Sequence, residues 1–251
     1  MKFKSIICSF VDFFFPNVCM SCGQIVENGE TLCDNCRENL DFIGKQNRCK
    51  FCGMEKPYCD CRNHIYYFER AVCVFFNSKT AKNIVYRYKL GFKSFYSEKI
   101  AEYMVNAFYE EYKDINFDAI ITVPTSFISS NKRGFDHTYL LAKEISKKTG
   151  IPLFKNALRV RALKPSQHKS DYKHRFSNVK NKYYFKRKID LENVLLVDDI
   201  KTTGATLDAC SKQLLLAGAR HIFCLTALGG GHSKPTGKAV IKKIKKVEKS
   251  S

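Results

Sequence analysis

Hydrophobic residues form four short runs after the first quarter of the chain, and longer amphipathic stretches lie between them. The runs are rich in valine, isoleucine, leucine and phenylalanine, and polar residues bound them. Apolar runs of this length are typical of strands in a sheet that is covered on both faces. We therefore predict four strands, at residues 71–76, 118–124, 193–199 and 221–228.

Three further stretches space their apolar residues three and four positions apart, as on one face of a helix. They predict helices over 99–112, 136–150 and 205–219. Gly150 and Gly218 stand at or near the ends of the last two, where glycine commonly terminates a helix. Strands that alternate with helices favour an α/β fold with a parallel sheet, which binds ligands at the carboxyl ends of its strands.

Cysteine is concentrated at the start of the chain, where the first 61 residues hold nine of the twelve. Cys19-x2-Cys22 is followed after ten residues by Cys33-x2-Cys36. Two such knuckles supply four thiolates, which form a closed, structural zinc site. Disulfides in a secreted domain are the alternative, but the spacing favours metal.

A second set of cysteines follows, Cys49-x2-Cys52 and Cys59-x-Cys61, with a tighter second half. The module is therefore predicted to hold one or two structural zinc ions. The spacing leaves open which knuckles pair, and an interleaved arrangement is one option. The remaining cysteines lie in apolar surroundings and are predicted to be core residues: Cys8, Cys73, Cys210 and Cys224.

The opening segment is hydrophobic enough to raise the question of a signal peptide. Asp12 interrupts its apolar run, Pro16 ends it, and no small-residue cleavage site follows before the cysteines. We expect instead a short amphipathic helix, no membrane span and a cytoplasmic protein. The predicted organisation is an N-terminal helix and cysteine module over 1–64, an α/β domain over 65–230, and a basic, disordered tail over 231–251.

The chain is strongly basic, with a formal net charge of +19 from 43 Lys and Arg against 24 Asp and Glu. Residues 155–188 hold twelve basic side chains against Asp171 alone, and residues 232–251 hold seven lysines against Glu248. Charge this localised indicates polyanionic partners such as phosphates, nucleic acid or an anionic membrane. A solvated basic surface is the alternative interpretation.

The predicted strand at 193–199 ends in Asp198 and Asp199, and a segment rich in threonine and glycine follows directly. Two carboxylates can accept hydrogen bonds from a vicinal diol or hold Mg²⁺ through water. The loop enters a helix, whose N-terminus offers backbone N–H groups to an anion. Gly204 lets the backbone approach a ligand closely. A diol together with phosphate describes a ribose 5-phosphate, whereas a plain N-capped helix is the structural alternative.

The whole run from Val194 to Thr206 resembles the motif with which type I phosphoribosyltransferases bind phosphoribosyl pyrophosphate (PRPP). Lys201 departs from the apolar residue that is frequent at its position. The resemblance implies a type I phosphoribosyltransferase-like parallel sheet flanked by helices and preceded by the cysteine-rich, zinc-binding module. It also implies Mg²⁺ bound with PRPP, and this set of PRPP-binding residues: Asp198, Asp199, Lys201, Thr202, Thr203, Gly204, Ala205, Thr206 and Arg133.

Two further stretches narrow the resemblance to the ComF family. Residues 118–146 are similar to the family segment in which a Val-Pro turn precedes Arg-Gly-Phe and a helix, and residues 158–179 to its arginine-rich segment. The order of parts, with the cysteine module first, also resembles that family. Asp136-His137 and Lys164 depart from its usual residues, which affects the acceptor side of the site.

The ComF resemblance implies a role in natural competence, in which incoming single-stranded DNA is taken up and handled. PRPP, single-stranded DNA and a helicase-like competence protein are the partners that it implies. Lys89 is a further candidate for the cleft. The basic loop has aromatic residues among its charges and could either close over PRPP or track DNA; its candidates are Arg159, Arg161, Lys164, Gln167, Lys169 and Arg175.

Two other functions stay open at this point. One is an active phosphoribosyltransferase of nucleotide or base metabolism, in which catalysis would be electrostatic and no general base is assigned. The other is a non-catalytic scaffold that binds zinc and nucleic acid. No pocket for an acceptor base is recognisable in the sequence, so turnover and the acceptor are left unassigned.

Overall fold

The computed structural model describes residues 16–44, 48–54, 59, 61, 65–90, 94–124, 136–160, 182–185 and 187–230. Several predictions concern residues outside these ranges. They are the N-terminal helix, the tail, Cys8, Arg133, and the loop residues Arg161, Lys164, Gln167, Lys169 and Arg175.

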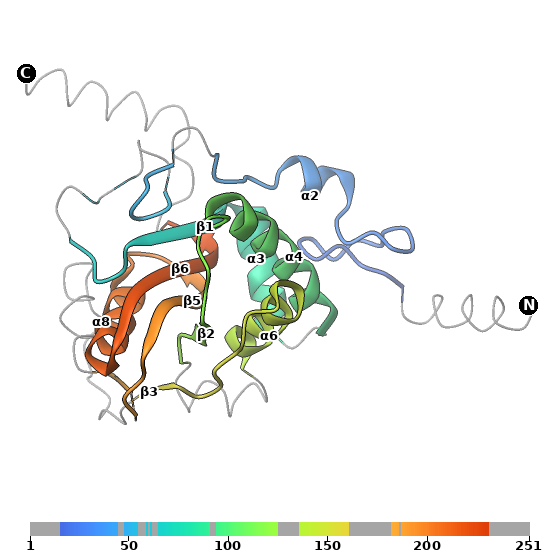
Figure 1. Cartoon of the computed structure of the whole chain (residues 1–251). Coiled ribbons are helices and arrows are strands. Elements are labelled where there is room, and N and C mark those ends of the chain that lie inside the picture. Colours follow the sequence, from blue (N-terminus) through green and yellow to red (C-terminus); the bar gives the residue numbers. More distant parts are fainter. Residues whose placement is uncertain are drawn as a thin grey trace, which may run out of the picture.

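The centre of the fold is a four-stranded, fully parallel sheet with the order β1-β6-β5-β2 (Figure 1). The parallel sheet flanked by helices was predicted and is confirmed. All four predicted strands are present: β1 (Arg70–Phe76), β2 (Ala119–Thr122), β5 (Leu191–Lys201) and β6 (Ala219–Gly229). A two-stranded antiparallel hairpin, which the sequence pattern did not predict, joins β3 (Leu158–Val160) to β4 (Tyr183–Phe185).

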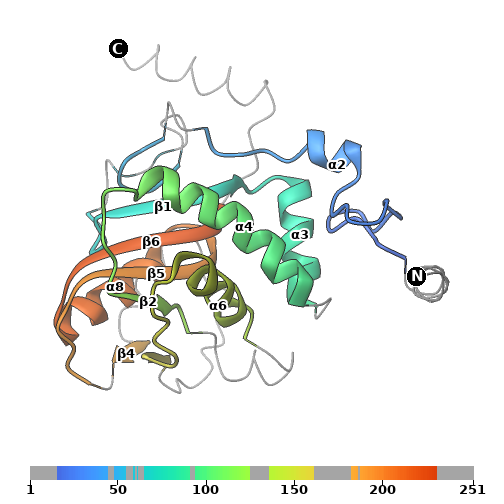
Figure 2. The same cartoon turned by 45° about the vertical axis from the view of Figure 1, so that its right-hand side comes forward.

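Helices cover both faces of the sheet (Figure 2). One face carries α3 (Lys79–Lys89), α4 (Ser94–Glu111) and α6 (His137–Thr149), and the other carries α8 (Ala205–Ala217). The helix predicted over 99–112 begins earlier, at Ser94, and α3 was not predicted at all. Gly150 and Gly218 terminate α6 and α8 in the left-handed conformation, as their positions predicted.

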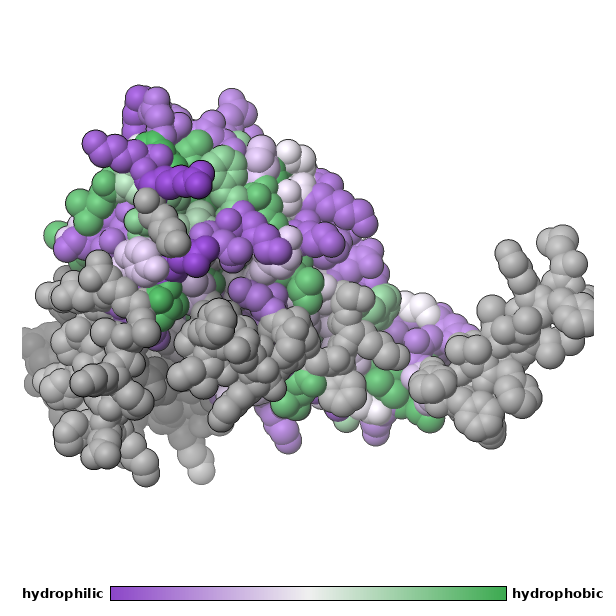
Figure 3. Space-filling model, turned by 90° about the horizontal axis from the view of Figure 1, so that it is seen from below, coloured by the Kyte–Doolittle hydropathy of each residue, from purple (hydrophilic) through white to green (hydrophobic). Residues whose placement is uncertain are grey.

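The strands alternate between two cores, which explains their continuous apolar runs. Leu195 and Val197 of β5 face the core beneath α3, α4 and α6, whereas Val194 and Leu196 face the core beneath α8. The isolated cysteines of the sheet domain are buried as predicted, at Cys73, Cys210 and Cys224. Seen from below the view of Figure 1, hydrophilic residues cover much of the described surface, with small hydrophobic groups between them (Figure 3).

The cysteine-rich module lies along one end of the sheet domain, and its short helix α2 (Asp34–Glu38) is near α3 and α4 in both views (Figures 1 and 2). Backbone hydrogen bonds tie the chain that follows α2 to β1: the Ile43 N–H donates to the Val74 carbonyl and the Phe76 N–H to the Asp41 carbonyl. The module is thus attached to the sheet through main-chain contacts.

Candidate functional site

The two adjacent aspartates lie near the carboxyl end of β5, inside the strand. Register with β6 continues through Asp198 and Ile200 to Lys201, because β6 extends to Gly229. On the other side, β2 pairs with β5 only as far as Val197. Asp198 and Asp199 therefore lie just beyond Val197, the last residue of β5 that pairs with β2.

Asp198 and Asp199 point to opposite faces of the sheet, as successive side chains of a strand do. Both are buried. Burial, and then the neighbouring charge of Asp199, raise the pKa of the Asp198 carboxyl well above its usual value. The Asp199 backbone N–H donates to Asp198 Oδ1 at 2.8 Å, which partly opposes this rise. Asp198 is thus a carboxylate held in an unfavourable setting, as is common at binding sites.

Asp199 faces α3 and forms an ion pair with its last residue. Lys89 Nζ lies 2.8 Å from Asp199 Oδ2, and both side chains are mostly buried. Tyr88, beside Lys89, donates its hydroxyl to the His137 carbonyl at the start of α6. Burial and the charges of Asp199 and Asp136 raise the Tyr88 pKa. The structure thus brings Lys89, a weaker sequence candidate, directly into the site.

The loop after β5 is shaped by Gly204, which precedes α8 with a φ of 82°. This left-handed conformation favours glycine. Thr203 is buried, and its hydroxyl accepts a hydrogen bond from the Ala205 N–H at 3.2 Å. Thr202 is exposed. The turn leads directly into the first turn of α8, where backbone N–H groups lack partners within the helix.

Tyr183, on β4, borders the same site and was missed by the sequence reasoning. Its hydroxyl hydrogen-bonds with Thr206, and burial followed by the charges of Cys210 and Asp198 raises its pKa. Val160 pairs with Tyr183 between β3 and β4, so it lies close to the same site. Arg159, the one described loop candidate, is exposed on β3.

Tyr66 was also missed, and it contacts the loop from the side of the cysteine module. Its hydroxyl donates to the Thr203 carbonyl at 3.2 Å, and its ring stacks on Phe68 at 4.6 Å. Only the folded chain reveals this contact, since Tyr66 lies far from the loop in sequence. A Cβ at Gly204 would lie 3.1 Å from Tyr66 Cε1, so the ring closely approaches the turn.

The donor groups fit a phosphate and a hard cation. Asp198 and Asp199 supply carboxylate oxygens, the ligands that Mg²⁺ prefers. The loop from 202 to 206 supplies backbone N–H groups at a helix N-terminus, where phosphate binds. Lys89 adds positive charge at the same edge. The side chain of Lys201 is buried as well, although it carries a charge.

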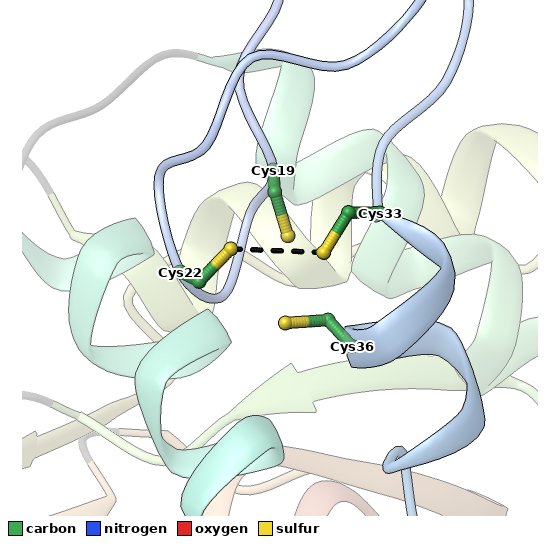
Figure 4. Close-up of side chains that lie close together, drawn as sticks. All are labelled: Cys19, Cys22, Cys33 and Cys36. Carbon is green, nitrogen blue, oxygen red and sulfur yellow. Dashed lines mark hydrogen bonds between the residues drawn. The ribbon is translucent and has the colours of Figure 1, made fainter.

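The first cysteine cluster consists of Cys19, Cys22, Cys33 and Cys36, whose sulfur atoms all lie within 4.8 Å of one another (Figure 4). Cys22 and Cys33 are 3.7 Å apart, Sγ to Sγ. A tetrahedral zinc site with bonds of about 2.3 Å places its sulfurs roughly 3.8 Å apart, whereas a disulfide needs about 2 Å. The cluster therefore fits zinc.

The second cluster consists of Cys49, Cys52, Cys59 and Cys61 and has the same dimensions. Cys49 Sγ is 3.8 Å from Cys61 Sγ, and Cys52 Sγ is 3.7 Å from Cys59 Sγ. Each cluster thus combines consecutive knuckles, which resolves the pairing that the spacing left open. The interleaved option is wrong.

The first thiol of each cluster is prepared to act as a thiolate. Burial disfavours the charge on Cys19, but backbone N–H groups of Cys22, Cys33 and Ser21 outweigh it and lower the pKa to about 6. Cys49 is similar: burial opposes ionisation, but backbone N–H groups lower its pKa to about 7. Zinc binds the thiolate form, so this hydrogen bonding favours metal at Cys19 and Cys49, whereas burial raises the pKa values of Cys36, Cys52 and Cys61.

Comparison with known proteins agrees with these two clusters. Residues 10–73 match the family described as the double zinc ribbon domain. Competence protein F of Haemophilus influenzae is 26% identical over 223 residues, which cover 83% of this chain and 95% of that protein. The chain is similar to competence protein F. The resemblance to the ComF family that the sequence motifs predicted is thereby confirmed.

The chain is similar to further proteins at lower identity. The DNA utilization protein YhgH of Escherichia coli O157:H7 is 22% identical over 213 residues, covering 83% of this chain and 89% of that protein. Among solved structures, adenine phosphoribosyltransferase of Saccharomyces cerevisiae gives a TM-score of 0.37 at 16% identity, covering 55% of this chain and 71% of that one. An allosteric regulatory enzyme of purine biosynthesis gives a TM-score of 0.33 at 21% identity, covering 52% of this chain and 25% of that one.

Among the described residues, no helix combines the length and apolar content that crossing a bilayer requires. The predicted cytoplasmic location and the predicted domain boundaries stay predictions.

Proposed function

We propose that this protein binds PRPP with Mg²⁺ at the end of β5 and acts in the handling of single-stranded DNA during natural competence. Asp198 and Asp199 would bind the ribose hydroxyls and the cation. The loop from Thr202 to Thr206 would hold the 5-phosphate, and Arg133 would reach the pyrophosphate. Lys89 would meet the same negative charge from α3.

The observation that carries the PRPP proposal is the juxtaposition of two buried carboxylates with a glycine turn at a helix N-terminus. Asp198 is destabilised as an anion by burial and by Asp199. A cation or a ribose hydroxyl beside Asp198 would offset this cost, while Asp199 would reach the ligand from the other face of the strand end. The motif from Val194 to Thr206 resembles the PRPP motif over its whole length, which supports the same ligand.

Bound Mg²⁺ would neutralise negative charge on the pyrophosphate. This chain's own residues would orient the ligand: the Gly204 turn would place N–H groups around the phosphate, and Lys89 would exchange its contact with Asp199 for one with the ligand. Such an arrangement binds PRPP whether or not transfer follows. An active phosphoribosyltransferase is therefore the second candidate function. It is tested by measuring the release of pyrophosphate from PRPP in the presence of candidate acceptor bases.

The DNA part of the proposal is supported by similarity to a competence protein and to a DNA utilization protein. The charge of residues 155–188 supports it independently, because polyanions attract such segments. Replacing the five basic loop candidates by glutamine should weaken single-stranded DNA binding and flatten its salt dependence; they are Arg159, Arg161, Lys164, Lys169 and Arg175. Binding that does not change between low and moderate salt would remove the loop from the proposal.

The decisive experiment is calorimetric titration of PRPP and Mg²⁺ into the wild type and into the double variant Asp198→Asn/Asp199→Asn. Charged hydrogen bonds contribute about 1.5–3 kcal/mol each, so the double variant should bind at least tenfold more weakly. Repeating the titration with single-stranded DNA present tests whether the two ligands are coupled. Binding to a helicase-like competence protein would be tested afterwards by co-purification.

Asp190→Asn is the matched control, because Asp190 is an exposed aspartate just before the same strand, and it pairs with Arg220. Its binding should equal that of the wild type. Lack of binding by the wild type would overturn the PRPP proposal and leave the zinc and DNA-binding scaffold as the function to examine.

A further inference from the structure

The second cysteine cluster lies against the sheet edge that supports the candidate phosphate loop. Cys52 shares a small core with Met54, Cys73 and Phe76, and Tyr66 packs against this group. The Ala71 N–H donates to the Phe51 carbonyl at 2.8 Å, within the knuckle. The knuckle and β1 are therefore in direct main-chain contact.

The knuckle lies so close to β1 that no side chain fits between their backbones. Gly53 has a φ of 72°, and a Cβ there would lie 2.3 Å from the Ala71 carbonyl oxygen. On the other side of the same core, a Cβ at Gly229 would lie 2.5 Å from Cys73 Cβ. Displacement of this knuckle would therefore displace the strand edge as well.

Two side chains continue from the cluster to the loop. Tyr66 packs against the cluster and donates its hydroxyl to the Thr203 carbonyl. Lys201 is 4% exposed, and its Cε lies 3.4 Å from the position of a Cβ at Gly204. Lys201 also pairs in register with Gly229, where a Cβ would lie 2.9 Å from Met54 Sδ in the core of the cluster.

The buried position of Lys201 has a simple electrostatic explanation. Four thiolates and one Zn²⁺ carry a net charge of about −2, so a buried cation beside them is stabilised rather than isolated. Zinc in the second cluster would hold Lys201, and Lys201 in turn fills the space beneath the Gly204 turn. The departure of Lys201 from the apolar residue usual in the motif is thereby explained.

We infer that the second cysteine cluster, through Tyr66 and Lys201, holds the loop of residues 202–206 in the conformation that binds phosphate. Tyr66 and Lys201 are positioning residues in this role. The inference rests on the proposed function for its ligand, but the state of the loop can be measured without PRPP. Metal in the second cluster should therefore control the loop, and metal in the first should not.

The first test uses hydrogen exchange of the full-length, zinc-loaded protein and compares Tyr66→Phe with Tyr67→Phe. Both variants lose one hydroxyl from neighbouring rings, but the Tyr67 ring lies beneath the Lys212 ammonium, 5.3 Å from it, on α8. A lost hydrogen bond corresponds to about three- to tenfold, so exchange at 202–206 should accelerate by that factor in Tyr66→Phe alone. Equal exchange in both variants would overturn the inference.

The second test compares Cys61→Ser with Cys22→Ser, after metal analysis shows the loss of one zinc from each folded variant. Exchange at 202–206 should rise in Cys61→Ser and stay unchanged in Cys22→Ser, whereas equal exchange would contradict the inference.

Lys201 has a test of its own. Lys201→Met should release zinc from the second cluster to a chelator faster than the wild type. An unchanged rate of zinc release would mean that Lys201 does not link the cluster to the loop. Variants whose loop exchanges faster should bind PRPP more weakly. If the wild type does not bind PRPP, only the proposed function is overturned, because the exchange of the loop is measured without PRPP.

Discussion

The two cysteine clusters have the same chemistry and nearly the same dimensions, yet they contact different parts of the molecule. The first shares the core beneath α3, α4 and α6, and Ser21 donates its hydroxyl to the Thr80 carbonyl of α3 at 3.2 Å. The second contacts β1 through the main chain and the loop through Tyr66. One cluster therefore supports a helix, and the other supports the sheet edge and the turn.

The difference places each cluster behind a different half of the candidate site. Lys89, which pairs with Asp199, is the last residue of the helix beside the first cluster. The Gly204 turn, which precedes α8, lies beside the second. Loss of either metal is thus expected to disturb ligand binding, but through different residues and with different effects on the sheet.

The largest effect should come from serine at a buried ligand of each cluster. Zinc contributes roughly 10 kcal/mol or more to the folding of small ribbons, so each change removes much local stability. Cys52→Ser should lower the melting temperature of the sheet, monitored by far-ultraviolet circular dichroism, because Cys52 packs on Cys73 and Phe76. Cys36→Ser should lower it less, while residues 17–40 become sensitive to protease. Equal shifts in the two melts would contradict the comparison.

The next effect concerns the ion pair between α3 and β5. Lys89→Met leaves Asp199 buried without its cation, which should cost about 3 kcal/mol of unfolding free energy in chemical denaturation. Adding Asp199→Asn should recover most of that loss. If the first cluster supports α3, the coupling energy between Lys89 and Asp199 should shrink in the Cys36→Ser background. A coupling energy that is the same in the Cys36→Ser background would show that the first cluster does not support the Lys89–Asp199 ion pair.

The sequence predicted what depends on local chemistry. Repeated apolar runs predicted the four parallel strands, and glycines marked the ends of α6 and α8, because these features need only the pattern along the chain. It missed α3, although the buried residues Ala81, Ile84, Val85 and Tyr88 have helical spacing, and with it the exact partner of Asp199. Tyr66 and Tyr183 could not be predicted, since they reach the loop from distant segments and neither has a motif. The opposite orientation of Asp198 and Asp199 follows from the strand continuing to Lys201, which the pairing with β6 determines.

A smaller effect separates the turn from its surroundings. Gly204→Ala places a side chain in the left-handed region, which costs about 1–2 kcal/mol, and also brings it against Tyr66. Gly150→Ala is the matched control: its φ is 77°, close to the 82° of Gly204, but no atom lies within 4 Å of its Cβ. Both variants should lose similar backbone stability, and only Gly204→Ala should weaken PRPP binding. Weaker binding in both would indicate a general loss of stability.

The smallest effect is a dependence of stability on pH that comes from Asp198. Its folded-state pKa is raised, first by burial and then by Asp199, so the folded protein prefers the protonated carboxyl. The sign follows: above about pH 4, where an ordinary carboxyl ionises, the wild type loses stability as pH rises towards the raised value. Asp198→Asn removes this penalty and should unfold at a higher temperature than the wild type, with a wider gap at pH 8 than at pH 5. Asp190→Asn, at an exposed position, should show no such widening.

The same raised pKa predicts proton release on ligand binding. Since Mg²⁺ favours the ionised carboxylate, its binding with PRPP should release protons, which calorimetry in buffers of different ionisation enthalpy measures directly. A gap that does not change with pH, together with no proton release, would mean that Asp198 is ionised in the free protein at no cost.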